Sequence, residues 1–120
     1  MAQRPTLAYA LGISVTVVEP GAFRTDFAGR SLTQSGTVID DYAETAGKRR
    51  KERDTMHGTQ PGDPAKAATA IITAVESDGP PAFLLLGNDS LNTYRRIAAA
   101  RLDTIETWEY LTTSTDIESV

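Results

Sequence analysis

Residues 13–19 constrain the fold of this chain more than any other segment. In this run β-branched apolar residues alternate with Ser14 and Thr16 and then become continuous, a composition typical of a strand covered on both faces. Pro20-Gly21 ends the run, because proline cannot donate to a β-ladder and glycine adopts backbone angles that other residues avoid. The sequence therefore predicts a buried strand that ends in a turn.

A second short apolar run, residues 82–86, is closed by Gly87 and predicts another strand. Between the two runs, Asp63-Pro64 predicts the start of a helix, because a carboxylate caps free N–H groups and proline suits the first helical position. Residues 77–81 stop this helix. Its apolar stripe consists of Ala67, Ala68, Ile71, Ile72 and Val75. Two strands joined by a long helical crossover indicate a parallel pair, so the predicted fold class is α/β.

Helical periodicity predicts two further helices. In residues 37–54 apolar positions recur every three or four residues, and the segment becomes highly charged after Gly47. Its basic run at 48–53 is flanked by acidic residues, so we expect a solvated helix face rather than a phosphate patch. After Asn88-Asp89-Ser90, which can cap a helix, an apolar stripe continues over residues 91–111. Residues 22–36 are expected to form a loop.

Composition restricts the function. With 120 residues, 40% of them hydrophobic, we expect one compact domain. A net charge of −4 argues against a nucleic-acid partner, because binding phosphates needs a basic face. There is no cysteine, and the single histidine, His57, is expected on a surface loop, so no metal site is predicted. No run approaches the ~20 apolar residues of a membrane span, and a cytoplasmic location is the default expectation.

Three segments carry a resemblance to a known family. Residues 12–25 resemble the sixth strand and following loop of the short-chain dehydrogenase/reductase family. Residues 62–68 are similar to the start of its last crossover helix, and residues 81–87 to its seventh strand. The resemblance implies that residues 1–120 form a single partial domain, the C-terminal part of an NAD(P)-binding Rossmann-like domain. It also implies two parallel strands, a long C-terminal helix and a substrate loop at about 28–60.

The turn after the first strand is the candidate cofactor site. Ligands of open α/β sheets bind outside the carboxyl ends of the strands, and Pro20-Gly21 lies at such an end. Gly21 would let the backbone approach a flat nicotinamide ring, and the resemblance implies carboxamide contacts from the backbone near Phe23 and from the hydroxyl of Thr25. The plainer alternative is an ordinary turn in which Thr25 caps a short helix at 26–27. The predicted cofactor-binding residues are Pro20, Gly21, Phe23 and Thr25, and the implied cofactor is NAD or NADP.

The catalytic pair that the resemblance implies, Tyr-x-x-x-Lys, does not occur in this chain. The four tyrosines, Tyr9, Tyr42, Tyr94 and Tyr110, are followed four positions on by Ile13, Ala46, Ala98 and Ser114. No two glycines are separated by a single residue, so the dinucleotide-binding G-x-G turn is also missing. A tyrosine with an ordinary pKa of about 10 needs a nearby positive charge to act as a base near neutral pH. We therefore predict no catalytic residue here, and no independent activity.

Two functions remain open. In the first, the chain is the C-terminal segment of an oxidoreductase that interconverts alcohols and carbonyls with NAD(P). Residues 1–11, where Pro5 interrupts a helix, suggest a gene fragment, a misplaced start or a remnant. In the second, the chain is a non-catalytic interaction or homo-oligomerisation module derived from that fold. Two strands leave unpaired edges and uncovered apolar faces, and the stripe at 91–111 would add to this surface.

Overall fold

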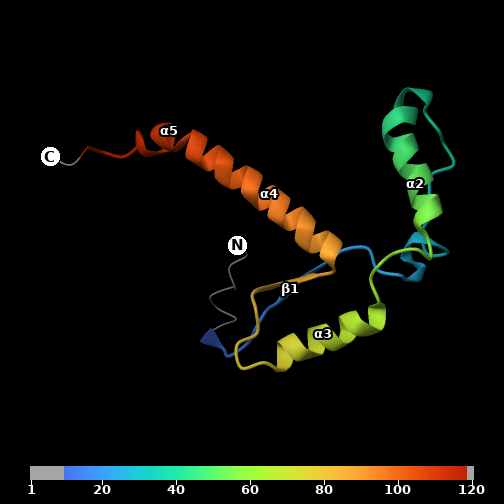
Figure 1. Cartoon of the computed structure of the whole chain (residues 1–120), viewed down its shortest axis with the longest axis horizontal. Helices are drawn as coiled ribbons and strands as arrows, with labels where there is room; N and C mark the ends of the chain where they lie inside the picture. The colour runs from blue at the N-terminus through green and yellow to red at the C-terminus, as the bar shows by residue number, and fades with distance from the viewer. Residues whose placement is uncertain (1–9, 119–120) are drawn as a thin grey trace.

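In the computed structural model, which describes residues 10–118, the chain forms a two-stranded parallel sheet connected and flanked by helices (Figure 1). The predicted α/β class is confirmed. The elements in chain order are β1 (Val17–Pro20), the 3₁₀-helix η1 (Asp26–Ala28), the 3₁₀-helix η2 (Asp40–Tyr42), the π-helix η3 (Ala43–Gly47), α2 (Lys48–Met56), α3 (Pro64–Glu76), β2 (Phe83–Leu86), α4 (Asn88–Thr107) and α5 (Glu109–Thr113).

The two strands pair in parallel from Val17 opposite Phe83 to Pro20 opposite Leu86. The first strand is shorter than the predicted 13–19. Extended backwards, this register places Val15 and Ser14 opposite Pro81 and Pro80, which have no N–H groups to donate to a ladder. The ladder therefore stops there, and the hydroxyl of Thr16 donates instead to the carbonyl of Pro81 at 2.7 Å.

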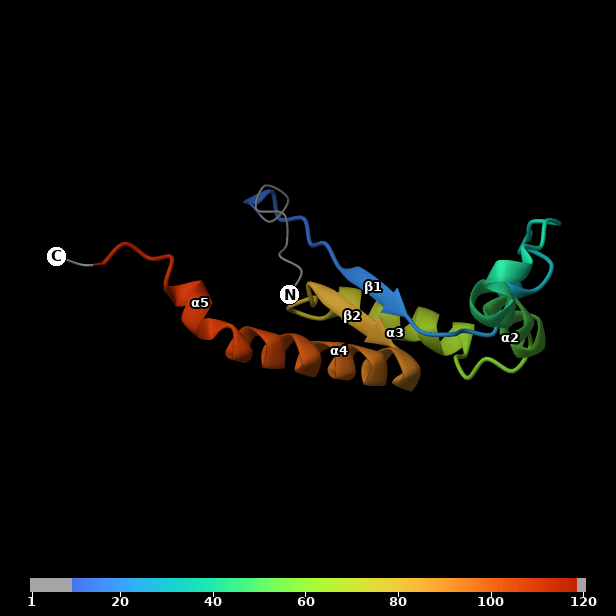
Figure 2. The same ribbon diagram turned by 90° about the horizontal axis from the view of Figure 1, so that it is seen from above.

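Helix α3 begins where the sequence predicts. The side chain of Asp63 caps it, because its Oδ1 accepts from the N–H of Ala65 at 2.9 Å and of Lys66 at 3.4 Å. The helix ends at Glu76, immediately before the predicted stop. It runs beside the sheet as the crossover from β1 to β2 (Figure 2).

The prediction of a helix at 37–54 is confirmed in part: the segment is helical, but it is irregular and begins and ends a few residues later. Helical structure runs from Asp40 to Met56 as η2, η3 and α2 in succession, and only α2 is regular α-helix. The irregular part ends at Gly47, a residue type that costs about 1 kcal/mol in a helix relative to alanine. The apolar residues Val38, Ile39 and Tyr42 are exposed, so no core contact holds this half of the segment in α-helical geometry.

The C-terminal stripe forms α4 and α5, which are separated by Trp108. The prediction that this helix begins after residues 88–90 is wrong, because it begins at Asn88 directly after Gly87, whose φ of 97° few other residues adopt. Gly87 has no side chain to cap the helix, but within the first turn the carboxylate of Asp89 accepts the N–H of Ser90 at 2.9 Å. Helix α4 packs on β2 through the rings of Tyr94 and Phe83, whose centroids lie 5.2 Å apart.

The expectation of one compact domain is also wrong for the described residues. The radius of gyration is 20.5 Å, whereas a compact chain of this length has about 14 Å. The accessible surface is 10165 Å², against about 6,300 Å² for a compact protein of this mass. Leu86 is the one hydrophobic residue buried within 10–118, so the predicted burial of the first strand on both faces is not met inside this chain.

Two remaining predictions concern the N-terminal residues 1–11 and the absence of a membrane-spanning helix. The interpretation of residues 1–11 as a helix that Pro5 interrupts lies largely outside the described residues, which begin at Ala10. Among the helices of residues 10–118, none is long and apolar enough to cross a membrane.

Candidate functional site

The turn after β1 is held by residues that follow β2. The N–H of Gly21 continues the ladder by donating to the carbonyl of Leu86 at 2.8 Å. The next N–H, that of Ala22, donates to Oδ2 of Asp89 at 2.8 Å. The carboxylate of Asp89 lies directly against Gly21, where any side chain would collide with it. Glycine is therefore required here for the close approach of this carboxylate.

The pKa of Asp89 is lowered from its ordinary value of 3.8, mainly because its carboxylate accepts the N–H of Ala22. Partial desolvation opposes this effect, and the N–H groups of Ser90 and of Asp89 itself add to it. Asp89 also lies in the first turn of α4, where a negative charge is favourable. The carboxylate is therefore ionised at neutral pH, and its hydrogen bond with Ala22 connects the turn after β1 to α4.

Ser90 makes a second connection between the same elements. Its hydroxyl donates to the carbonyl of Glu19, near the end of β1, at 3.0 Å. Sequence reasoning assigned Asp89 and Ser90 to a helix cap and missed this role. No local signal could have shown it, because Asp89 and its partner Ala22 lie 67 residues apart in sequence.

On its other side, the turn pairs with the segment that leads into α3. Phe23 and Gly62 form an isolated parallel bridge. In it the N–H of Gly62 donates to the carbonyl of Ala22 at 3.0 Å, and the N–H of Arg24 donates to the carbonyl of Gly62 at 2.9 Å. A Cβ on Gly62 would lie 2.6 Å from the ring of Phe23 and 2.8 Å from the carbonyl oxygen of Ala22. This glycine therefore allows the two segments to lie against each other.

Gln60 supports this pairing through contacts with Gly58 and Arg24. It is only 5% exposed, and its Oε1 accepts from the N–H of Gly58 at 2.8 Å. Its backbone carbonyl accepts from Nε of Arg24 at 3.1 Å. A buried amide with these partners fixes the connector between α2 and α3 against the turn.

Thr25 follows the bridge and begins η1. Its Oγ1 accepts from the N–H of Phe27 at 3.2 Å, so the predicted cap of a short helix is confirmed. The hydroxyl still has its own proton to donate. The N–H of Phe23 is likewise free, since it makes no hydrogen bond within the described part of the chain. Capping and ligand binding are therefore compatible at this position.

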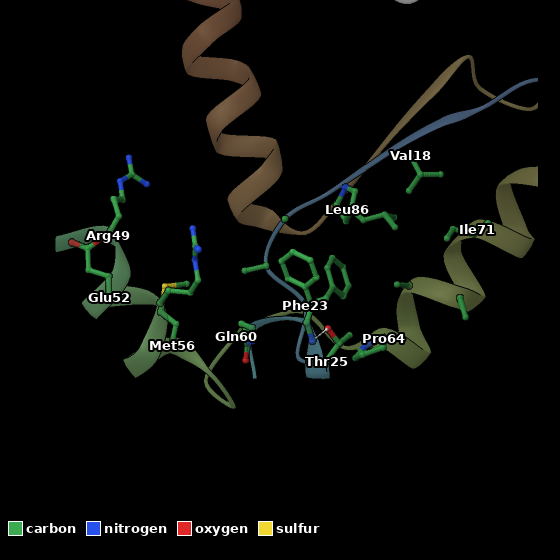
Figure 3. A pocket seen from close by; sticks show the side chains of 18 residues that line it. Val18, Phe23, Thr25, Arg49, Glu52, Met56, Gln60, Pro64, Ile71 and Leu86 are labelled. Atoms are coloured by element: carbon green, nitrogen blue, oxygen red, sulfur yellow. Dashed lines mark hydrogen bonds between the residues drawn. The ribbon is translucent and has the colours of Figure 1, made fainter. Parts of the chain in front are cut away.

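A cavity of about 750 Å³ opens beside this turn (Figure 3). Its volume lies in the range of small-molecule sites. All four residues predicted for cofactor binding line it, and their contact with a cofactor stays a prediction. The lining residues are Val18, Pro20, Gly21, Ala22, Phe23, Thr25, Phe27, Ala28, Arg49, Glu52, Arg53, Met56, Gln60, Pro64, Ala67, Ala68, Ile71 and Leu86.

Three charged residues of α2 also line this cavity: Arg49, Glu52 and Arg53. The sequence predicted a solvated face for the whole basic run, and these residues do reach solvent. They nevertheless lie at the cavity, which the charge pattern alone could not reveal. His57 packs against Gly29, and within residues 10–118 no group of three His, Cys, Asp or Glu side chains converges on a possible metal position.

Known proteins resemble this chain in sequence and in fold. An oxidoreductase of Botryotinia fuckeliana is 32% identical over 102 residues, which cover 85% of this chain and 37% of that protein. An uncharacterised oxidoreductase of Schizosaccharomyces pombe is 33% identical over 84 residues, covering 70% of this chain and 28% of that protein. The chain therefore spans less than two fifths of the curated relatives it matches. No protein-family model matches it.

A comparison with solved structures also finds a dehydrogenase with a similar fold. The crystal structure of a short-chain dehydrogenase from Streptomyces avermitilis superposes with a TM-score of 0.73 at 34% sequence identity. The match covers 92% of this chain and 40% of that structure.

Proposed function

This chain belongs to the short-chain dehydrogenase/reductase family, and on that premise we propose that it is the C-terminal portion of an NAD(P)-dependent oxidoreductase and forms its nicotinamide- and substrate-facing wall. Its substrates would be alcohols or carbonyl compounds. The observation that carries the proposal is the turn at residues 20–25, fixed at the carboxyl ends of two parallel strands and open to a cavity.

The described residues fit a nicotinamide. Pro20 and Gly21 line the cavity, and the ring of Phe23 offers an apolar surface. The free N–H of Phe23 and the hydroxyl of Thr25 are two donors suited to a carboxamide oxygen. A bound cofactor would supply the hydride, and this chain would supply position and an apolar environment.

Turnover would require further polypeptide. The glycine-rich turn for the pyrophosphate and the tyrosine and lysine of the resemblance have no counterpart in this sequence. The large exposed surface supports the same conclusion, because a strand pair this poorly covered gains stability by packing against further strands and helices. We accordingly propose that residues 1–120 act as a single partial domain, with the substrate loop at about 28–60, in the cytoplasm.

A chimaera tests this proposal. The chain replaces the matching portion of the Streptomyces avermitilis dehydrogenase, and binding of NADH and NADPH is followed by cofactor fluorescence. We expect the chimaera to bind one of them at least about 100-fold more tightly than the chain alone, because it restores the phosphate contacts.

Variants of the chimaera test the turn itself. Thr25→Val removes the hydroxyl and should weaken cofactor binding about tenfold, whereas Thr25→Ser should restore it. Thr33→Val, at an exposed position away from the cavity, is the matched control. A folded chimaera that binds neither cofactor, or equal effects of the two valine variants, contradicts the proposal.

A second function is favoured by one observation. The apolar side chains of α4 remain uncovered, with Leu102 60% and Ile105 62% exposed. A non-catalytic module that associates with itself or with another subunit would use this surface. Light scattering on the purified chain tests it: association that Leu102→Asp and Ile105→Asp abolish supports the module, and a monomer at all concentrations contradicts self-association.

A further inference from the structure

We propose that the cavity is selective for compounds with a carboxylate at the end of an apolar body, and that Arg49 and Arg53 bind that carboxylate. That these compounds are substrates of the oxidoreductase rests on the proposed function above. Recognition of the carboxylate rests only on the cavity and its charges.

The two arginines are placed to act together. They are one helical turn apart on α2 and both line the cavity. Within residues 10–118 neither guanidinium group makes a hydrogen bond or an ion pair, so all the donors of both side chains are available. Arg50 on the same helix differs, because its Nη2 donates to the carbonyl of Ser35 at 2.8 Å. A guanidinium matches a carboxylate with two parallel hydrogen bonds, and two guanidinium groups can share one carboxylate.

The charge of the cavity favours an anion. Glu52 is its one acidic lining residue, so the two arginines leave a net positive charge in a chain that is negative overall. The apolar walls beside this charge reduce the screening that water provides at an open surface.

The rest of the cavity specifies the other end of the ligand. Figure 3 shows the α2 side chains at one end, Val18 and Ile71 at the other, and Phe23 with Thr25 between them. A ligand that extends from one end to the other therefore has an anionic group at α2 and an apolar body along the sheet and α3. Its middle passes the turn where the nicotinamide is proposed, so that a carbonyl there would be near the reacting ring.

The test uses the full chain and two probes of the same shape. 4-Phenylbutyrate carries a carboxylate and 4-phenylbutyramide a neutral amide, and each is titrated while backbone amide chemical shifts are followed by NMR at pH 7. We expect the carboxylate to bind about tenfold more tightly, with shifts at α2 and at residues 20–25.

Charge variants on α2 complete the test. Arg49→Gln with Arg53→Gln should abolish the tenfold preference. Lys48→Gln with Lys51→Gln removes the same charge from the same helix outside the cavity lining, and should leave most of the preference. Glu52→Gln should tighten carboxylate binding about threefold, because it removes a repelling charge.

Three outcomes would overturn the proposal: no saturable binding of 4-phenylbutyrate, equal affinity of the two probes, or equal losses in the arginine and lysine double variants. The two proposals can fail separately, because the probe titration uses the chain without a cofactor. A folded chimaera that binds neither NADH nor NADPH contradicts the proposed function and leaves the carboxylate preference of the chain unchanged, whereas a chain that binds the two probes equally contradicts this inference alone.

Discussion

Gly62→Ala provides the most direct test of how the turn at 20–25 is held. A Cβ at this position would lie 2.6 Å from the ring of Phe23 and 2.8 Å from the backbone carbonyl of Ala22. The ring can rotate away, but the carbonyl belongs to the bridge itself. Relief therefore requires the segments to separate, which breaks the hydrogen bonds of Gly62 to Ala22 and of Arg24 to Gly62. At about 1 kcal/mol for each bond, the bridge loses about 2 kcal/mol.

Native-state hydrogen exchange measures this loss locally, which suits a chain with so little buried surface. The amide of Arg24 should exchange about thirtyfold faster in the variant, since 1.4 kcal/mol corresponds to a factor of ten. Gly36→Ala is the matched control, because a Cβ there meets no atom within 4 Å. Unchanged exchange at Arg24 in Gly62→Ala, or an equal acceleration in Gly36→Ala, would refute the assignment of this glycine to close packing.

Two further predictions concern carboxylates. Asp63→Ala should destabilise α3 by about 1 kcal/mol through loss of its cap, seen as faster amide exchange over its first turn, whereas Asp78→Ala, beyond the helix end, should not. Because the pKa of Asp89 is lowered in the fold, its hold on the turn is present above its ordinary value of 3.8 and is lost as the pH falls through the lowered value. The amide shift of Ala22 should therefore titrate with a midpoint below 3.8, and Asp89→Asn should remove this transition. A midpoint at or above 3.8, or the same transition in the asparagine variant, would show that another group controls the turn.

The sequence predicts the elements that depend on local chemistry. Asp63-Pro64 starts α3 because both residue types satisfy a helix N-terminus by themselves. Phe83–Leu86 forms a strand closed by Gly87, whose φ of 97° suits glycine. The parallel pairing follows from the long connection between the two apolar runs.

Features that depend on distant residues were missed. The length of β1 is limited by prolines opposite the residues that precede it, which only the register reveals. Asp89 has the composition of a helix cap, yet its carboxylate serves a turn 67 residues away. The charge pattern predicts a solvated face for the whole basic run at 48–53, although two of its arginines line the cavity and a third donates to the backbone carbonyl of Ser35. Such distinctions need the orientation of a helix, which periodicity does not contain.

The sequence predicts the position of the candidate site, whereas the role of its residues needs binding experiments. The end of a parallel strand identified Pro20 and Gly21, the family resemblance implied Phe23 and Thr25, and all four line the cavity. Their role toward a cofactor remains a prediction, as does the use of alcohols or carbonyl compounds as substrates.

The parallel ladder also has a consequence for how the chain folds. Its strands meet only after a long intervening segment has been ordered, as the contact of Thr16 with Pro81, 65 residues apart, illustrates. Closing so large a loop costs entropy before any pairing energy is gained, and proteins rich in such contacts fold slowly. During synthesis the first strand would therefore wait, unpaired, until the second has emerged from the ribosome, and a chaperone or a neighbouring strand could bind it in that interval.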